Sequence, residues 1–545
     1  MKRISNLISL LAVVVVAASC SASRAEKMKM AESVKVDCEP EVLALVGDKI
    51  PAEISVSYPD GYFHPKVVME VTPVLVYEGG EKALEPFTYQ GDKVKDNHKV
   101  VSSKGGTVKE KFAFEYVPGV EKSYLELRSV VYYGSKQIVV PAIKVADGVN
   151  TTQMLAHSSG EYSFKKDNYQ EVLHEKAEGQ IMYAKNSAQV KSSELRSESI
   201  KELQAALEEI AGDPRYTVKG TKVIAYASPE GGQSLNAKLS DKRASSASKV
   251  WNKVTGMQAD QLEVQSVGQD WEGFQEAVSN SSIEDKELIL RVLSMYSDPA
   301  VRENEIRNMS QVYTEINKNV FPELRRARLI AEVDYQNFSD AELEELANKA
   351  IDLLDEEGLL RVAANANTAE RKESLYKTAV SKYGSDRAKF NLAVLSLNAG
   401  QPEVAQAYLS GIRKSDDDVV NAKGVCELQK GNLDAAAALF RQSSSAEAAA
   451  NLGTVALLKG NYAEAARILA PTEGKNKALA LMLDGQLDKA SAAITCKCPK
   501  SNYLRAIIAA RKGDAQTVKT CLEAASAKES LKERSEKDVE FADFR

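Results

Sequence analysis

The feature that most constrains this chain of 545 residues is a short phrase that recurs near its end. A glycine, a polar residue and an alanine-rich stretch occur together five times: GQPEVAQAYL from Gly400, GNLDAAAALF from Gly431, GNYAEAARIL from Gly460, GQLDKASAAI from Gly485 and GDAQTVKTCL from Gly513. Helix-forming stretches such as AAANLGTVALLK lie between them, and the glycines are 31, 29, 25 and 28 residues apart. Each unit therefore predicts two helices joined by a glycine turn, and units of this kind stack around one continuous core.

These units resemble tetratricopeptide repeats, although they are shorter than the about 34 residues typical of that family. We expect an α-solenoid of such repeats over residues 339–525, opened by a capping box at Ser339–Glu342, and a charged tail over 526–545 that ends as a frayed helix. The resemblance implies a concave face that holds a protein or a peptide. Alanine and leucine build the array whether or not anything binds, so the sequence singles out no contact residue there.

The amino terminus predicts an export signal. Met1-Lys2-Arg3 is basic, and the apolar run from Leu7 to Ala18 is too short to span a bilayer. The small residues before Cys20 resemble a bacterial lipobox, which implies a signal peptide over 1–19 and lipidation of Cys20. The alternative is an ordinary signal peptide cut near Ala18. We expect a lipid anchor and tether over residues 20–49, which would place the protein on the outer membrane, facing the periplasm.

Residues 50–150 show the alternation of apolar and polar residues that is typical of strands. Runs such as EISVSY, VVMEVTPVLVY and SYLELRSVVYYG are separated by turn signals such as Pro59-Asp60-Gly61. Short strands with turns between them predict a β-sandwich. Pro73 within one run predicts an edge strand or a bulge, because proline cannot donate to a sheet ladder.

Residues 178–336 change pattern and predict the order strand, helix, strand, helix, strand, followed by a helical insertion and a closing strand. Leu195, Ile200, Leu203, Leu207 and Ile210 lie on one face of the first helix, and TVKGTKVIAYA is a strand. The turn SPEGG follows that strand, and then N-x-x-L-S-x-x-R-A continues as a helix. This order and this motif resemble the C-terminal, peptidoglycan-binding domain of outer-membrane protein A (the OmpA-like domain). The fold class is therefore multidomain α+β.

The OmpA-like resemblance implies a site for the stem peptide of peptidoglycan. In that family an Asp in the turn and an Arg on the helix hold diaminopimelate, and Arg243 matches the Arg. A planar guanidinium suits this role because it can hold a carboxylate through two parallel hydrogen bonds. Ser228 stands where the family has its Asp, and Glu230 could supply the missing carboxylate. The predicted ligand-binding residues are Ser228, Glu230, Asn236, Arg243 and Arg326.

A second interpretation of the same residues stays open. The fold could keep this helix face without a ligand, so that Asn236 braces the turn, Leu239 is core and Arg243 pairs with Asp241 or Glu230. Arginines that lead into a strand, such as Arg325, Arg326 and Arg328, are commonly a solvated face paired with surface acids.

The remaining composition excludes other classes. A net charge of −6 argues against nonspecific nucleic-acid binding. Six scattered cysteines do not make a disulfide scaffold, and Cys496-Lys497-Cys498 lacks the second ligand pair of a zinc site, so these cysteines read as structural small residues. We expect no cofactor, no metal and no catalytic residue.

The sequence thus predicts a non-enzymatic lipoprotein that tethers the membrane to peptidoglycan and scaffolds a protein partner through its repeats. The alternative is an accessory subunit of a secretion or surface-fibre assembly, in which the OmpA-like domain no longer binds peptidoglycan.

Overall fold

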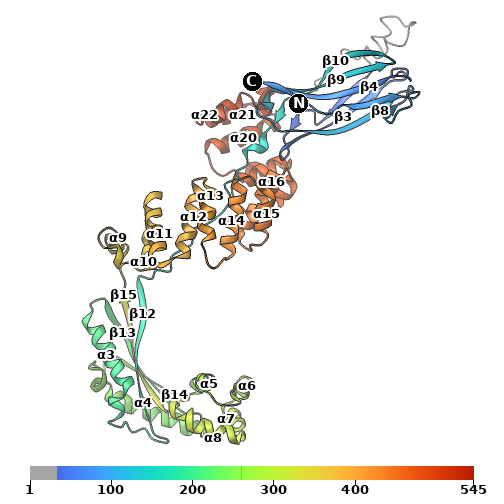
Figure 1. The fold of residues 1–545 in the computed structure, drawn as a ribbon. Helices are drawn as coiled ribbons and strands as arrows, with labels where there is room; N and C mark the ends of the chain where they lie inside the picture. The colour runs from blue at the N-terminus through green and yellow to red at the C-terminus, as the bar shows by residue number, and fades with distance from the viewer. Residues whose placement is uncertain (1–33, 259–260) are drawn as a thin grey trace. The chain divides into compact units, whose positions relative to one another are not determined.

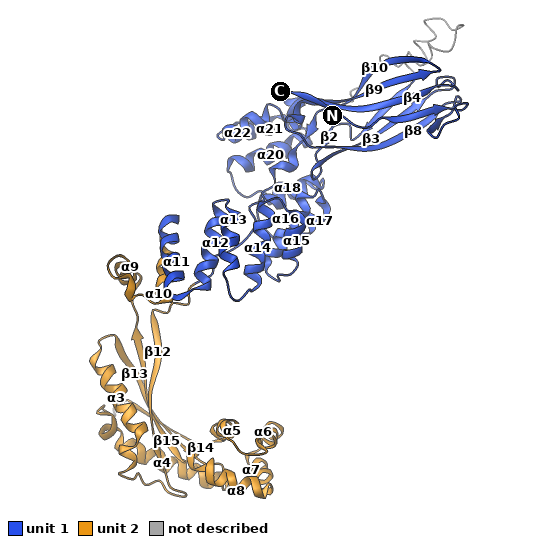
Figure 2. Cartoon of the chain, in the orientation of Figure 1, with its two compact units in different colours: residues 1–166, 367–545 blue, residues 167–366 orange. Residues whose placement is uncertain are grey.

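The structure is a computed structural model that describes residues 34–258 and 261–545. It divides into two compact units, which are coloured separately in Figure 2. Unit 1 combines the described residues up to Lys166 with Asn367–Arg545, and unit 2 is Asp167–Ala366. The predicted signal peptide and the predicted lipidated residue, Cys20, lie outside the described residues.

The first part of unit 1 consists of strands in two main sheets (Figure 1). The strands are β1 (Lys35–Glu39), β2 (Leu43–Ala44), β3 (Lys49–Tyr58), β4 (Val68–Tyr77), β5 (Gly80–Ala83), β6 (Phe87–Gly91), β7 (Lys99–Val101), β8 (Gly106–Glu115), β9 (Ser123–Tyr133), β10 (Lys136–Asp147) and β11 (Val149–Asn150). One sheet has the order β1-β3-β8, and the other has the order β10-β9-β4-β6-β7 with β5 paired to β4. Burial alternates along β3 and β9 with the period of two that the sequence predicts.

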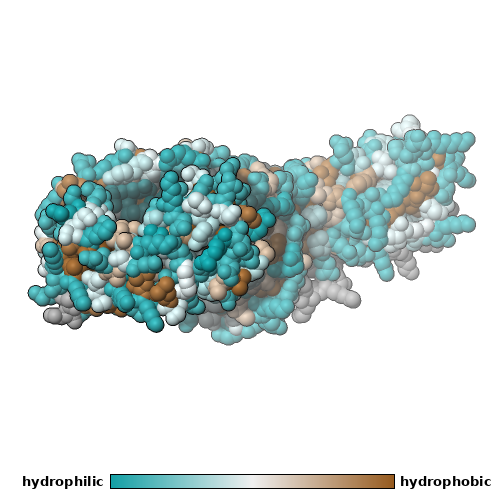
Figure 3. Space-filling model, turned by 90° about the horizontal axis from the view of Figure 1, so that it is seen from below, coloured by the Kyte–Doolittle hydropathy of each residue, from teal (hydrophilic) through white to brown (hydrophobic). Residues whose placement is uncertain are grey.

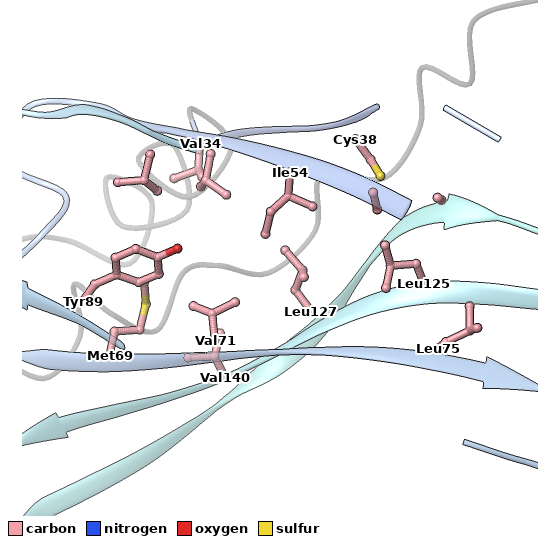
Figure 4. Packing of buried hydrophobic residues seen from close by; sticks show 14 of the residues in the cluster. Val34, Cys38, Ile54, Met69, Val71, Leu75, Tyr89, Leu125, Leu127 and Val140 are labelled. Atoms are coloured by element: carbon pink, nitrogen blue, oxygen red, sulfur yellow. The ribbon is translucent and has the colours of Figure 1, made fainter. Parts of the chain in front are cut away.

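Both sheets contribute to one hydrophobic core. Figure 4 shows Ile54 of β3 and Leu127 of β9 pointing toward one another, and Met69 and Tyr89 next to each other in the same core. These are N-terminal β-rich sheets, as the alternating pattern predicts.

The sheets begin earlier than predicted. Residues 35–49 were expected to belong to the tether, yet β1 pairs along its whole length with β3. Val34, Cys38 and Leu43 are buried in the core. Because these apolar residues are removed from water, this part of the chain belongs to the folded unit.

Pro73 lies in an inner strand and not at an edge. β4 pairs with β9 on one side, where Pro73 stands opposite Leu127. On the other side Val68–Val71 pair with β6 and Val74–Tyr77 pair with β5. Pro73 falls between those two partners, where a missing N–H costs no ladder hydrogen bond.

The second part of unit 1 is the helical repeat. Its helices are α11 (Ala369–Tyr383), α12 (Asp386–Asn398), α13 (Pro402–Ser410), α14 (Asp417–Gln429), α15 (Leu433–Phe440), α16 (Ala446–Leu458), α17 (Tyr462–Ile468), α18 (Lys475–Leu483), α19 (Leu487–Ala493), α20 (Pro499–Lys512), α21 (Ala515–Ala525) and α22 (Glu529–Ser535). The five phrase glycines lie in the turns between paired helices, with φ between 67° and 83°. This left-handed conformation favours glycine, which explains why the phrase repeats it.

The end of the chain is packed and not frayed. Phe541 is buried against Tyr503, with ring centroids 5.5 Å apart. Tyr503 donates a hydrogen bond of 2.8 Å to Asp538, and Glu540 pairs with Arg511. The predicted fraying therefore differs from the structure, because an aromatic anchor and two buried carboxylates tie down this polar segment.

Unit 2 contains a four-stranded sheet of order β12-β15-β13-β14. Its elements are β12 (Val172–Met182), α3 (Glu198–Gly212), β13 (Tyr216–Ala227), α4 (Gln233–Thr255), β14 (Leu262–Gln269), α5 (Trp271–Asn280), α6 (Lys286–Met295), α7 (Pro299–Asn308), α8 (Ser310–Asn319), β15 (Arg326–Gln336), α9 (Asp340–Lys349) and α10 (Glu356–Asn365). Helices α3 and α4 pack on the sheet through a core that includes Leu203, Trp251 and Leu329. The inserted helices α5 to α8 have a core of their own around Phe274.

The order of elements in unit 2 agrees with the predicted one, but its end does not. Ser339 and Glu342 form the predicted capping box at the start of α9. Helices α9 and α10 belong to unit 2, so the compact part that contains the repeats begins at Asn367 and not at residue 339.

The face of the molecule in Figure 3 is mostly hydrophilic, with hydrophobic residues in small separate patches. Among the described residues, no helix combines the length and the apolar character needed to cross a bilayer.

Candidate functional site

The turn after β13 contains two of the predicted site residues, and a third residue holds it in shape. Asn236, on the first turn of α4, donates from Nδ2 to the carbonyl oxygens of Ser228, Glu230 and Gly231, at 3.2, 3.1 and 3.0 Å. Asn236 is 3% exposed and Ser228 is 5% exposed. Asn236 thus braces the turn, as the second interpretation of the sequence expects.

Arg243 lies inside unit 2. Its guanidinium donates to the backbone carbonyls of Ser187, Tyr226 and Ala184, at 3.0, 2.8 and 3.3 Å, and its side chain is fully buried. Burial lowers the pKa of Arg243 to about 10, because carbonyl dipoles replace water only in part. The partners are backbone oxygens and not the acids Asp241 or Glu230 that the sequence suggested.

Glu230 is also engaged within the protein. Its carboxylate pairs with Arg325 at 2.7 Å and with Lys185 at 3.1 Å, and it accepts a hydrogen bond from the Ser228 hydroxyl. The Glu230 side chain is 9% exposed, so both charges of the Arg325 pair are largely removed from water.

Arg326 faces the helical insertion. Its Nη2 pairs with Asp270 at 3.0 Å, and its guanidinium lies 5.4 Å from the ring of Tyr226. Asp270 also caps α5 by accepting from the Gly273 N–H, and burial raises the pKa of Asp270.

The structure therefore places Ser228 and Glu230 in the turn after β13, and Asn236 and Arg243 on α4, the helix that follows it. Each of these polar groups already has a partner within unit 2. Peptidoglycan binding by these residues stays a prediction.

The helical repeat holds a second arrangement of polar side chains, which the sequence did not single out. Asn391, Asn421, Asn451 and Asn476 lie on α12, α14, α16 and α18, the first helices of four successive pairs. We call these four residues the asparagine row. The chain's own residues 157–165, which precede unit 2, lie along it without regular secondary structure. We call residues 157–165 the clamped segment.

The asparagine row binds the backbone of the clamped segment at every fourth residue. Asn476 accepts from the His157 N–H and donates to its carbonyl, both at 2.8 Å. Asn451 does the same at Glu161, at 2.7 and 2.9 Å, and Asn391 does so at Lys165, at 2.8 and 2.9 Å. Each amide thus satisfies both the donor and the acceptor of one residue, which favours an extended chain whatever its side chains.

Asn421 completes the row by supporting its neighbour. It donates to the carbonyl of Glu161 and accepts from Asn451 Nδ2, each at 2.9 Å. Asn451 is fully buried and Asn421 is 3% exposed. Burial makes these hydrogen bonds costly to lose, because an unpaired amide cannot turn to water.

Side chains of the clamped segment add contacts of their own. Lys165 Nζ pairs with Asp416 and Asp418 at 2.6 and 2.9 Å; burial opposes its charge, but the two carboxylates outweigh burial and raise the pKa of Lys165. Gly160 has φ of +79°, and a Cβ there would lie 2.7 Å from Val425. These contacts favour this particular segment over others.

A sequence signal for the row exists, but it is weak. Asn391, Asn451 and Asn476 each lie nine residues before a phrase glycine, and Asn421 lies ten residues before Gly431. Asparagine is common near helix ends, and nothing local shows that these side chains meet a segment more than 200 residues away.

The described residues contain no group of three or more His, Cys, Asp or Glu side chains placed to hold a metal ion. A pocket of about 590 Å³ lies against α17, α18 and α19, where Ala466, Leu481 and Ala493 are among the residues that line it.

No family model matches this sequence, and no curated protein matches it either. Among solved structures, the chain is similar to a tetratricopeptide repeat protein from Parabacteroides merdae, with 17% identity and a TM-score of 0.31 over 37% of this chain and 91% of that one. It is similar to the Cut9–Hcn1 hetero-tetramer of APC/C, with 13% identity and a TM-score of 0.31 over 58% of this chain and 64% of that one. It is also similar to Salmonella alpha-2-macroglobulin, with 10% identity and a TM-score of 0.13 over 83% of this chain and 27% of that one. The similarity to repeat proteins covers part of the chain, and scores this low carry no argument about function.

Proposed function

We propose that this chain is a non-enzymatic scaffold protein of the bacterial cell envelope whose asparagine row binds an extended protein segment. The observation that carries the proposal is the set of paired hydrogen bonds from Asn391, Asn451 and Asn476 to single backbone residues. Backbone recognition requires an extended chain but few particular side chains, so a partner's segment can use the same row as the chain's own residues 157–165.

The chain's own segment sets the affinity of such a partner. A segment of the same chain that is held beside the repeats competes at an effective concentration of about millimolar. A partner therefore binds well only when it offers better side-chain contacts or when the clamped segment is released. The clamped segment therefore acts as an intramolecular competitor for the asparagine row.

The envelope location in this proposal rests on the sequence, through the lipobox-like residues before Cys20. For the OmpA-like domain we propose a structural role, as in an accessory subunit of a larger assembly. The internal hydrogen bonds of Arg243 and the internal ion pairs of Glu230 support this role over a grip on peptidoglycan.

The row is tested with a variant in which residues 157–165 are replaced by nine glycine and serine residues. A labelled peptide of residues 153–168 should bind this variant at least about tenfold more tightly than it binds the intact chain, because the intramolecular competitor is gone. Adding Asn451→Ala should weaken binding by about 30-fold or more. Adding Asn502→Ala should leave binding unchanged, since Asn502 bonds to Lys497 and Arg505 instead. Equal binding by the intact and replaced chains would contradict the proposal.

The role of unit 2 is tested by sedimentation with purified peptidoglycan sacculi. We expect the intact chain to stay in solution. Retention that is lost in a folded Glu230→Gln variant would instead support the predicted membrane-to-peptidoglycan tether.

A further inference from the structure

The loop between α19 and α20 brings two thiols together at the surface. Cys496 Sγ lies 3.2 Å from Cys498 Sγ, within van der Waals contact, and Ser501 Oγ lies 2.9 Å from Cys496 Sγ. Cys496 is exposed and Cys498 is half-buried. A disulfide needs a separation of about 2.05 Å, so the two sulfurs must approach by about a further 1.2 Å for the bond to form.

Cys498 occupies the N-cap position of α20, where the first N–H groups of the helix have no intrahelical partner. As a thiol, Cys498 donates to the Ser501 hydroxyl at 3.5 Å. Once the proton is lost, the hydroxyl and the N–H of Ser501 favour the thiolate, and Cys496 and Lys475 favour it further. Together these groups lower the pKa of Cys498 to about 6. At neutral pH Cys498 is then mostly thiolate, which is the nucleophilic form.

The other described cysteines differ from this pair. Cys38 and Cys426 are buried, and burial raises the pKa of each to about 11. Burial also raises the pKa of the half-buried Cys521. Among the described thiols, only Cys496 and Cys498 are both accessible and within reach of one another.

We propose that Cys496 and Cys498 form a redox-active dithiol that exchanges with a disulfide of another molecule, with Cys498 as the attacking thiol and Cys496 as the resolving thiol. The Cys498 thiolate attacks one sulfur of the incoming disulfide, forms a mixed disulfide and expels the first partner thiolate. Cys496 then loses its proton to solvent and attacks Cys498 Sγ, which expels the second partner thiolate. The dithiol is oxidised by two electrons, and the incoming disulfide is reduced by the same two.

The rate of attack is estimated from the thiolate fraction and the nucleophilicity. At pH 6 about half of Cys498 is thiolate, whereas an ordinary thiol of pKa about 8.5 is about 0.3% thiolate. The lower basicity of Cys498 reduces its intrinsic reactivity by about tenfold, with a Brønsted coefficient of about 0.45. Cys498 should therefore react about tenfold faster than an ordinary cysteine at pH 6, and its rate should level off above about pH 7.

The test uses the intact chain, first reduced and then mixed with glutathione disulfide or with a short peptide disulfide at pH 6. Trypsin cuts after Lys489, Lys497 and Lys500, so mass spectrometry should find residues 490–497 joined to residues 498–500 through the new disulfide. Faster reaction with the peptide would indicate a protein partner, and faster reaction with glutathione would indicate the small-thiol pool.

Three single variants assign the roles of the sulfurs. Cys496→Ser should stop at a mixed disulfide on Cys498, Cys498→Ser should lose the fast reaction, and Cys521→Ser should react like the parent. The proposal is overturned if residues 490–500 keep two free thiols, or if Cys498 reacts no faster than Cys521 between pH 5.5 and pH 7.

Discussion

Replacing Asn451 with alanine should release the middle of the clamped segment. The amide of Asn451 makes three hydrogen bonds, two to the backbone of Glu161 and one to Asn421 Oδ1. A net contribution of about 1 kcal/mol per bond gives about 3 kcal/mol. The backbone of Glu161 is near the surface and can find water once released, which lowers the expected loss to about 2–3 kcal/mol.

Hydrogen exchange at the Glu161 amide measures this loss directly, because its N–H is bound to Asn451 Oδ1 at 2.7 Å. A local opening that is easier by 2–3 kcal/mol makes exchange about 30-fold to 150-fold faster. Exchange at His157 and Lys165 should rise less, since Asn476 and Asn391 still hold those residues.

The matched control is Asn502→Ala, on α20, the first helix of the pair that follows the asparagine row. This variant should leave exchange at the Glu161 amide unchanged. The reasoning is refuted if Asn451→Ala changes exchange at Glu161 by less than about threefold, or if the two variants have the same effect. Either outcome would mean that the hydrogen bonds to Asn451 do not hold the segment in solution.

Two further predictions concern packing. Gly160→Ala should weaken the clamped segment by about 1–3 kcal/mol, because its φ is positive and its new Cβ would meet Val425 at 2.7 Å; limited proteolysis after Lys165 should become faster, and no change would contradict the observed contact. Phe541→Ala should lower the free energy of unfolding by about 3 kcal/mol in denaturant titration, since it empties a buried site against Tyr503, whereas the exposed Phe164→Ala should have little effect; equal losses would show that the end of the chain is not anchored as described.

Local sequence patterns predicted the elements but not the contacts between distant segments. The phrase glycines predicted the helix turns because left-handed φ is a property of single residues. The alternation along β3 predicted burial for the same kind of reason. The place of Pro73 was missed, because its cost depends on which strands stand beside β4.

At the candidate sites, too, the sequence predicted local features but not the contacts between distant segments. The motif around Asn236 and Arg243 predicted that both residues lie on the helix beside the turn at Ser228, and Asn236 does brace that turn. The partners of Arg243 are the backbone carbonyls of Ala184, Ser187 and Tyr226. Every residue has a backbone carbonyl, so the residue types in the sequence could not reveal these partners. The asparagine row was missed because its ligand is also backbone, from a segment far away in the sequence.

A last prediction concerns pH, at the end of the clamped segment nearest the dithiol. His157 is held by Asn476, and its Nε2 lies 3.2 Å from Nζ of Lys500, two residues after Cys498. Burial lowers the pKa of His157, and Lys500, Lys475 and Lys528 lower it further. The unfolded or released segment therefore binds a proton more readily than the clamped one, so protonation favours release. Clamping should be at full strength above about pH 6.5, the ordinary pKa of histidine, and should weaken as the pH falls below it.

Hydrogen exchange at the His157 amide, corrected for intrinsic exchange, should show this loss between pH 7 and pH 5. His157→Gln should remove the pH dependence while Asn476 still holds the backbone, and His174→Gln, on β12, should not. An unchanged pH profile in His157→Gln would show that another group controls the release.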